Sequence, residues 1–367
     1  GPLGAARIRG RRPGADAEAV REALAAVDEV AALERSGRGV AVAAAPDAAP
    51  VLLRLVREGS TLEGREIAVV ARLLEAGRRT ADELRRVAAD APRAARLAVP
   101  LPHADLDRRL ARSIDADGAV LDAASPALAA ARREVRTARE RLVKRLEALL
   151  RGVDGGAEDA TITLRNGRYV IPVRRESRQR PDGIVHDESS SGATLFIEPS
   201  ATIPLGNAER EAEIAEEREV RRVLAELTVL LRPWAESLAG VQEMCVAADD
   251  LAARGRYAAR CDAVAPAVGA PGAPIVVRGG RHPILLARGI PVVPFDLILA
   301  PGERTVLVSG PNTGGKTVFL KAVGLLAALA QSGIVPPLGA GSSLPLFHRF
   351  HADIGDHQSI AADLSTF

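Results

Sequence analysis

The chain has 367 residues, of which 47% are hydrophobic and 26% charged, and its formal net charge is +2. This composition is typical of a globular protein of two or three domains, and it excludes intrinsic disorder and a strongly basic tail. Its longest apolar stretch, residues 322–335, is shorter than the ~20 residues of a membrane span, so we expect no membrane partner. Two cysteines, Cys245 and Cys261, cannot build a disulfide framework, so we expect a cytoplasmic protein.

The N-terminal third has a helical pattern. Residues 15–115 are rich in Ala, Leu and Arg, and short breaks separate segments whose apolar residues recur at helical spacing. We expect four or so short helices packed as a bundle, in an N-terminal helical core over residues 1–120. We also expect a fragment of a longer protein, because the only methionine is Met244 and the chain stops within a motif described below. The Gly-Pro-Leu-Gly start could be native or the remnant of a tag.

Two long amphipathic segments follow within residues 121–265. The first begins at Ser125-Pro126, a helix-start signal, and ends at Gly152. The second runs from Asn207 to beyond Val241, and Pro233 predicts a kink or a break within it. The spacing predicts an antiparallel coiled coil, although two neighbouring helices of a bundle would have the same spacing.

Between these helices the period changes to that of strands. Residues 160–164 and 169–173 flank an Asn166-Gly167 turn, which predicts a β-hairpin. We therefore predict a small β module, over about residues 157–206, at the tip of a helical arm. Its two other predicted strands are Gly183–His186 and Ala193–Ile197.

The β module contains a cluster of arginines between positions 165 and 180, against one acid, Glu176. Such a cluster predicts a surface that binds the phosphate backbone of a nucleic acid through charge. A solvent-exposed hairpin that binds no nucleic acid would have the same charge, and it is the alternative interpretation. No ladder of aromatic residues accompanies the arginines, which disfavours stacking on single strands. The candidate nucleic-acid residues are Arg165, Arg168, Arg174, Arg175, Arg178 and Arg180.

From about Pro266 the pattern predicts the opening of an α/β domain, over residues 266–367. Arg304–Val308 ends in three apolar residues, and we expect it to be a buried strand; a helix is predicted from Lys316 to about Ser332. Short β-runs precede these elements at residues 274–277, 284–286, 291–293 and 297–299.

A phosphate-loop pattern, G-x4-G-K-[ST], lies between this predicted strand and helix. Its glycines and the helix N-terminus would turn backbone amides toward phosphates. Lys316, one of only three lysines in the chain, would reach the β- and γ-phosphates of ATP, and Thr317 would ligate Mg²⁺. The expected nucleotide-binding residues are Gly310, Pro311, Asn312, Thr313, Gly314, Gly315, Lys316 and Thr317.

Two further clusters contain residue types found in catalytic or metal sites, but their sequence context indicates a structural role. His186-Asp187 and the serines at 189–191 have the residue types of a catalytic triad, but a polar turn is the better interpretation. A cluster near the C-terminus lacks the spacing of metal ligands, and its acids lie in a turn-like segment rather than after a buried strand. The metal candidates are His348, His351, Asp353 and His357, and the acids weighed as the Mg²⁺-binding and water-polarising acids of an ATPase are Asp353 and Asp356.

With these motifs in place, the chain resembles the MutS family of ATPases, in its second bacterial branch, MutS-II. The resemblance spans nearly the whole chain, with departures at Phe295 and His357. It implies a mixed fold: an α-helical core, a long antiparallel helical arm carrying a small β clamp module, and the start of an α/β P-loop ATPase domain of the ABC type. The residues that carry it are Arg281-His282-Pro283 with Gly310–Gly324, Asp353–Ser359 with Leu364–Phe367, and Ile171–Val173, Gly183–Asp187 and Ser191–Pro199.

The resemblance also implies a function. It implies a homodimeric, ATP-dependent DNA-binding clamp, with ATP and Mg²⁺ as cofactors, that binds branched or recombination-intermediate DNA and suppresses homologous recombination. Ser365 would join Lys316 as a catalytic residue by reaching the γ-phosphate in the partner's site. In some members the implied partner is the collided ribosome, which the ATPase splits, and endonuclease activity would belong to a C-terminal domain beyond Phe367. The alternatives are a non-hydrolysing scaffold gated by nucleotide, and an SMC-like or transporter-type ATPase.

Overall fold

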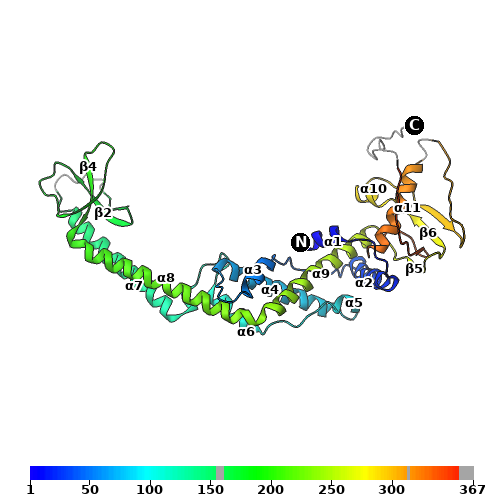
Figure 1. Cartoon of the computed structure of the whole chain (residues 1–367), viewed down its shortest axis with the longest axis horizontal. Coiled ribbons are helices and arrows are strands. Elements are labelled where there is room, and N and C mark those ends of the chain that lie inside the picture. The colour runs from blue at the N-terminus through cyan, green and yellow to red at the C-terminus, as the bar shows by residue number, and fades with distance from the viewer. Residues whose placement is uncertain (154–160, 312–314, 355–367) are drawn as a thin grey trace. The chain divides into compact units, whose positions relative to one another are not determined.

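The computed structural model describes residues 1–153, 161–311 and 315–354 (Figure 1). The chain forms two compact units, each built from helices and one small sheet, so the predicted mixture of helix and sheet is confirmed. Among the described residues, no helix is both long and apolar enough to cross a membrane. The first unit comprises Gly1–Ala49, Arg72–Pro102 and Glu236–Phe367, and the second comprises Pro50–Ala71 and His103–Ala235. The predicted boundaries at residues 120 and 265 stay predictions.

The second unit contains two long helices, α7 (Pro126–Leu150) and α8 (Ile203–Leu231). α7 begins where the sequence predicts, because the Ser125 hydroxyl accepts a hydrogen bond from the Leu128 amide at 3.1 Å and Pro126 occupies the first turn. The shorter helices of this unit are α3 (Ala49–Leu55), α6 (Ala104–Ser113), η1 (Asp122–Ala124), η2 (Ser200–Thr202) and η3 (Arg232–Trp234).

α7 and α8 lie side by side and run antiparallel (Figure 1). Ion pairs join Arg132 to Glu216 at 2.9 Å and Arg139 to Glu209 at 2.7 Å, so later residues of α7 meet earlier residues of α8. This confirms the predicted antiparallel pair. The break predicted at Pro233 is also confirmed, since α8 ends at Leu231 and a 3₁₀ turn separates it from the next helix.

The β module is a four-stranded antiparallel sheet in the order β1-β2-β4-β3. Asn166 and Gly167 connect β1 to β2 with φ angles of 51° and 74°, the left-handed conformation that a tight two-residue hairpin turn requires at both positions. Three of the predicted strands are confirmed, and of the first, residues 160–164, the structure places Thr163 and Leu164 in a strand. The strands of the module are β1 (Thr163–Arg165), β2 (Arg168–Arg174), β3 (Gly183–Glu188) and β4 (Thr194–Pro199).

The module shares an apolar core with the end of α7. Leu142 and Leu146 of α7 pack against buried side chains of β2 and β4, and Leu146 has no exposed surface. The core fixes the sheet on the helix, because burying each such side chain stabilises the packing by roughly 1.5–3 kcal/mol. Its buried members are Leu142, Leu146, Val153, Ile171, Val173, Leu195 and Ile197.

In the first unit, the longest helix is α9 (Ala235–Arg260). Asp250 of α9 is buried, and it pairs with Arg254 at 2.7 Å and with Arg11 at 2.6 Å. This unit therefore buries a carboxylate with two guanidinium partners, as an internal charge requires. The other N-terminal helices are α1 (Pro2–Gly10), α2 (Ala17–Arg35) and α5 (Pro92–Ala95), and α4 (Gly64–Arg86) contributes to both units.

The sheet of the first unit has the order β5-β8-β6-β7. β6 and β7 are antiparallel neighbours, and β5 and β8 run parallel. The predicted runs at 274–277 and 297–299 are confirmed in β6 and β7, and the predicted helix after the phosphate loop is confirmed as α11 (Lys316–Gln331). The strands are β5 (Ala267–Gly269), β6 (Ile275–Gly280), β7 (Phe295–Leu299) and β8 (Ser343–Pro345).

Three predicted strands of this region are wrong. Residues 284–286 belong to a helix, α10 (Pro283–Ala287), because His282 caps it and Pro283 suits a first turn. Residues 291–293 form no strand, since Pro291 and Pro294 lack the amide protons of a β-ladder. Residues 304–308 are neither a strand nor buried; Leu307 is 91% exposed, and no described strand lies beside this segment to complete its hydrogen bonds.

Candidate functional site

The phosphate-loop segment lies at the start of α11. Gly315 caps the helix with a φ of 74°, and Gly310 has a φ of 153°, two conformations that favour glycine. These φ angles therefore explain why the phosphate-loop pattern has glycine at positions 310 and 315. Thr317 is the second residue of α11. Asn312, Thr313 and Gly314, which the sequence also predicts to bind nucleotide, lie outside the described residues, as does Ser365.

Lys316 is the first residue of α11, and its side chain folds back over the segment before the helix. Its ammonium group donates hydrogen bonds to the carbonyl oxygens of Gly310 at 2.5 Å and Pro311 at 2.9 Å. These acceptors are neutral carbonyl groups, and a charged donor binds anionic oxygens more strongly. The geometry therefore holds one positive charge at the N-terminus of a helix, where the helix dipole also favours anions.

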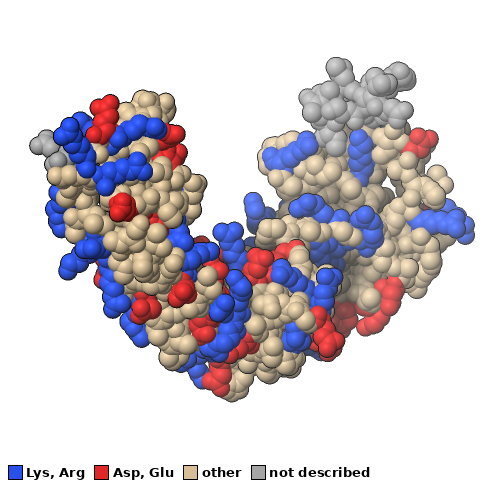
Figure 2. All heavy atoms as spheres, turned by 60° about the vertical axis from the view of Figure 1, so that its left-hand side comes forward, with Lys and Arg blue, Asp and Glu red and all other residues tan. Residues whose placement is uncertain are grey.

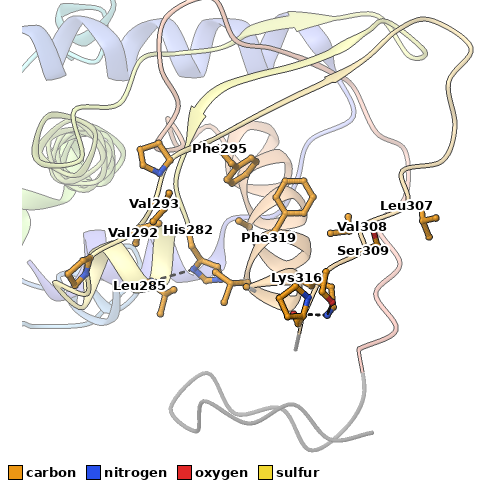
Figure 3. Close-up of a pocket in the computed structure, with 17 residues that line it drawn as sticks. His282, Leu285, Val292, Val293, Phe295, Leu307, Val308, Ser309, Lys316 and Phe319 are labelled. Atoms are coloured by element: carbon orange, nitrogen blue, oxygen red, sulfur yellow. Dashed lines mark hydrogen bonds between the residues drawn. The ribbon is translucent and has the colours of Figure 1, made fainter. Parts of the chain in front are cut away.

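Beside this lysine is a cavity of about 820 Å³ (Figure 3). One wall is apolar: Phe295 and Phe319 meet edge to face with ring centroids 4.8 Å apart, and Val292 and Val293 lie next to them. At the other end the lining is polar, with the backbone of residues 309–311 and the Lys316 ammonium. A molecule with an aromatic or apolar end and an anionic end would match both linings.

His282 also lines this cavity, and it is 1% exposed. Its Nδ1 accepts a hydrogen bond from the Leu285 amide at 3.4 Å, as the N-cap of α10. Burial lowers the pKa of the imidazole, so the ring is neutral and carries its proton on Nε2. The Nε2 atom is buried and has no hydrogen-bond partner in the described structure. A buried donor without an acceptor is costly, which makes Nε2 a candidate contact for a bound molecule.

The sequence places His282 in a motif that resembles the MutS-II branch, but it does not predict that His282 lines the nucleotide site. The available signal was local: a His-Pro pair at the start of an apolar run is a helix-start pattern. Nothing in that pattern shows that the ring is buried or that one nitrogen is left without a partner. The apolar wall at Val292–Phe295 was likewise missed, because the run was expected to be a strand.

The candidate nucleic-acid surface belongs to the second unit. Three of its six arginines are held within the module, where Arg168 contacts Asn207 at 3.0 Å and Glu198 at 3.6 Å. Arg165 lies 3.2 Å from Asp187 and over the ring of Phe196, at 4.7 Å from the ring centroid. Arg175 pairs with Glu188. These three side chains therefore have structural partners.

The other three arginines, which we call the free arginines, are Arg174, Arg178 and Arg180. All three are exposed, and they form no ion pair with any described residue. Figure 2 shows basic side chains gathered on the module, interrupted by a few acids. The structure thus divides the predicted cluster into cations that hold the sheet together and cations that face solvent.

The two clusters that the sequence favoured as structural show no catalytic arrangement among the described residues. His186 contacts Glu198 through Nε2 at 2.7 Å, and Ser189 accepts a hydrogen bond from the Thr194 amide, so the serines belong to a turn, as predicted. Over the described ranges, no three His, Cys, Asp or Glu side chains are grouped closely enough to hold a metal ion. His357 and Asp356 lie outside those ranges.

Comparison with known proteins decides the family. The chain is 45% identical over 375 residues to a protein named Endonuclease MutS2 from Gemmatimonas aurantiaca, an alignment that covers 99% of this chain and 45% of the relative. The chain belongs to the MutS2 family. Relatives of the same name from Geobacillus kaustophilus and Thermomicrobium roseum are 41% identical, over 100% of the chain and 47% of the relative, and 46% identical, over 70% and 34%. The chain thus spans less than half the length of these MutS2 proteins.

No protein-family model matches the chain. The family membership therefore rests on the MutS2 relatives, and it agrees with the MutS-II resemblance carried by the motifs.

Proposed function

We propose that this chain is the nucleotide-binding and DNA-binding part of an ATP-dependent clamp of the MutS2 family. The observation that carries the proposal is the position of Lys316, a cation at the N-terminus of α11 and at the polar end of a cavity of about 820 Å³. Two acceptors of its ammonium group are neutral carbonyl oxygens, and a charged donor binds anionic phosphate oxygens more strongly than neutral ones.

ATP fits the described residues on three counts. The cavity has an apolar wall for a purine ring and a cationic end for phosphates. The described glycines, Gly310 and Gly315, adopt conformations that bring backbone close to a ligand. Finally, the unpartnered Nε2–H of His282 offers a hydrogen bond to a polar atom of the nucleotide. A site that was only a structural turn would not explain this buried donor.

The described residues have distinct roles in this proposal. Lys316 neutralises the phosphates, and Thr317 would hold Mg²⁺ through its hydroxyl group. Phe295 and Phe319 exclude water from the apolar wall. Ser365 would reach the γ-phosphate of the site in a second copy of the chain. ATP with Mg²⁺ would supply a phosphoanhydride bond between the β- and γ-phosphates, and its hydrolysis can drive a conformational cycle.

The DNA-binding part of the proposal rests on the β module. Its free arginines are exposed cations that no described acid neutralises, and binding to phosphates needs such groups. The relatives are named endonucleases, which indicates a nucleic-acid substrate for those proteins. We propose that a homodimer binds branched or recombination-intermediate DNA and suppresses homologous recombination. We propose nuclease activity only for the longer protein.

The experiment is nucleotide binding by the Lys316→Ala chain, measured with a fluorescent ATP analogue and Mg²⁺. Charged hydrogen bonds contribute about 1.5–3 kcal/mol each, so the affinity should fall by roughly 10- to 150-fold. The matched control is Arg288→Ala, which removes an exposed positive charge of the same unit that does not line the cavity. Its affinity should stay within about twofold of the original.

Equal affinities in Lys316→Ala and the original chain would refute the phosphate assignment. If this chain binds ATP but the longer protein shows no hydrolysis in a DNA-dependent turnover assay, the protein is instead a scaffold gated by nucleotide. Binding to collided ribosomes without binding to junction DNA would assign the clamp to the other implied partner.

A further inference from the structure

The helix that begins at Lys316 ends on a buried glutamine. Gln331 is the last residue of α11, and it is 5% exposed. Its amide nitrogen donates hydrogen bonds to the carbonyl oxygens of Gly14 at 2.8 Å and Phe347 at 2.9 Å, and its amide oxygen accepts one from the Phe347 amide at 2.9 Å. Both polar atoms of the side chain therefore have partners, as the burial of an amide requires.

The two hydrogen bonds between Gln331 and Phe347 have the pattern of a strand pair. Phe347 donates its backbone N–H and accepts at its backbone carbonyl, as a residue of a β-ladder does, but its partner is a side chain. β8 ends two residues earlier, at Pro345, and the Leu346 amide donates to the carbonyl oxygen of Gly269 at 3.2 Å. Gln331 thus extends by one residue the hydrogen bonding that holds this part of the chain.

The chain that follows Phe347 is held much less. In the described structure, no hydrogen bond or ion pair joins residues 348–354 to the rest of the molecule. The ring of Phe350 lies 5.7 Å from that of Phe347, so this contact too depends on where Phe347 is placed. The 348–354 segment carries exposed side chains that are charged or can become charged, which are His348, Arg349, His351 and Asp353.

Two arginines hold the same end of α11. Arg11 donates to the carbonyl oxygen of Ser332 at 3.0 Å, and Arg254 donates to that of Gly333 at 2.6 Å. Cations suit the C-terminal end of a helix, where carbonyl groups lack amide partners within the helix. Both guanidinium groups also pair with the buried Asp250, so this end of α11 is fixed to α9 and to the N-terminal part of the chain.

α11 connects this anchored end to the candidate phosphate site. Its 16 residues form a helix about 24 Å long, with Lys316 first and Gln331 last. Seven extended residues span at most about 25 Å, so the 348–354 segment is long enough to return along α11 to the Lys316 end. A displacement of Phe347 would move the whole segment, since no other described hydrogen bond holds it.

We propose that Gln331 is a positioning residue for the ATP turnover of the proposed function. Its amide fixes the start of the 348–354 segment, and ties that start to the helix that carries Lys316. The inference rests on the proposed nucleotide site and adds to it a residue at the other end of α11. Because Gln331 lies about 24 Å from the phosphate end, it should affect turnover and leave the affinity for ATP unchanged.

The first measurement needs no substitution. Hydrogen exchange of this chain is followed by mass spectrometry, with and without a non-hydrolysable ATP analogue and Mg²⁺. A nucleotide held at the start of α11 should make opening at its far end rarer, so the peptide that contains Phe347 should exchange more slowly with the analogue present. Peptides of α7, which belongs to the other compact unit, are the control and should not change.

The outcomes of this measurement separate the two proposals. If the chain binds the analogue and the Phe347 peptide exchanges at the same rate, the inference about Gln331 fails and the nucleotide site stands. If the chain does not bind the analogue, the proposed function and the inference fail together.

The second measurement compares ATP turnover by the longer protein with and without Gln331→Met. Methionine is flexible and has no amide, so Phe347 loses both hydrogen bonds while the space stays filled. A misplacement of about 1 Å can cost up to ~100-fold in rate, so we expect kcat to fall by about 10- to 100-fold, with KM within about twofold. The matched control is Gln242→Met in α9, whose amide oxygen accepts from the Ala48 amide at 2.9 Å. Its kcat should stay near the original.

A kcat of Gln331→Met within about twofold of the original would overturn the inference, whatever the melting temperature does. An equal fall of kcat in Gln242→Met would overturn it too, because a general loss of stability would then explain both variants. A higher KM at unchanged kcat would assign Gln331 to nucleotide binding instead of positioning. If Gln331→Met does not fold, the exchange measurement on the unsubstituted chain decides.

Discussion

The hydroxyl group of Ser125 donates a hydrogen bond to Glu219 at 2.6 Å. The same oxygen accepts the Leu128 amide as the N-cap of α7, so one atom both begins α7 and ties it to α8. Arg222 completes the arrangement by donating to both carboxylate oxygens of Glu219. The start of the helical pair is thus set by one serine, one acid and one arginine.

Glu219→Gln should change how stability depends on pH. The hydrogen bonds from Arg222 and Ser125 lower the pKa of Glu219 from 4.5 to about 2. A lowered carboxyl pKa stabilises the folded state above the unfolded pKa, and this contribution disappears as pH falls from about 4.5 to about 2. We expect the original chain to melt higher than the variant at pH 7 and the difference to vanish near pH 2, by circular dichroism. Glu226→Gln, which removes the exposed partner of Arg222, should show a much smaller difference.

His282→Asn tests the buried imidazole of the first unit. Asparagine can still accept the cap hydrogen bond, but it does not titrate. Burial lowers the pKa of His282 below 6.5, so the unfolded chain takes up the proton first as pH falls. The original chain should therefore lose stability relative to the variant below about pH 6.5, by at most ~1.4 kcal/mol per pH unit. Parallel stability curves between pH 7.5 and 5 would contradict a buried, neutral ring.

Replacing the free arginines Arg174, Arg178 and Arg180 by glutamine should weaken binding to all DNA sequences about equally. The slope of log K against log salt should fall by about 0.9 for each phosphate that is no longer neutralised. ATP turnover without DNA should stay near normal, because the phosphate loop belongs to the other compact unit. The matched control replaces Arg165, Arg168 and Arg175, which are held by acids of the module, and should affect melting more than salt slope. An unchanged slope in the first variant would show that the free arginines contact solvent and not DNA phosphates.

Gly64→Ala should destabilise the second unit. An added Cβ would lie 1.9 Å from the carbonyl oxygen of Gly118, a backbone atom that cannot turn away. We expect the free energy of unfolding in urea to fall by about 1–3 kcal/mol. Gly240→Ala in α9 is the opposite case, since no described atom other than those of its chain neighbours and of its own helix backbone lies within 4 Å of the added methyl group. That variant should gain about 0.5–1 kcal/mol from helix propensity, and a decrease there would contradict the described packing.

Features of the fold that depend on local chemistry were predictable from the sequence. Ser125-Pro126 begins a helix because a hydroxyl cap and a fixed φ act within one turn. Asn166-Gly167 forms a hairpin because both residues tolerate positive φ. Pro233 interrupts a long helix because it has no amide proton. Each of these outcomes is decided within a few residues of the chain.

Features that depend on distant partners were not predictable. Arg304–Val308 has the composition of a buried strand, but a strand also needs a neighbour, and no described strand pairs with it. Arg168 and Arg174 look alike in sequence, yet Glu198 lies near Arg168 and no described acid pairs with Arg174. His282 became a site candidate only through the burial of its ring. The role of Ser365 stays a prediction.

The core that Leu142 and Leu146 share with the sheet has a mechanical consequence. These side chains belong to α7 and to the packing of the module at once, so the sheet cannot tilt on the helix without opening apolar surface to water. A load applied to the module by a bound polymer would therefore act on α7 directly. The β module is therefore rigidly attached to α7 and does not move as a flexibly linked domain.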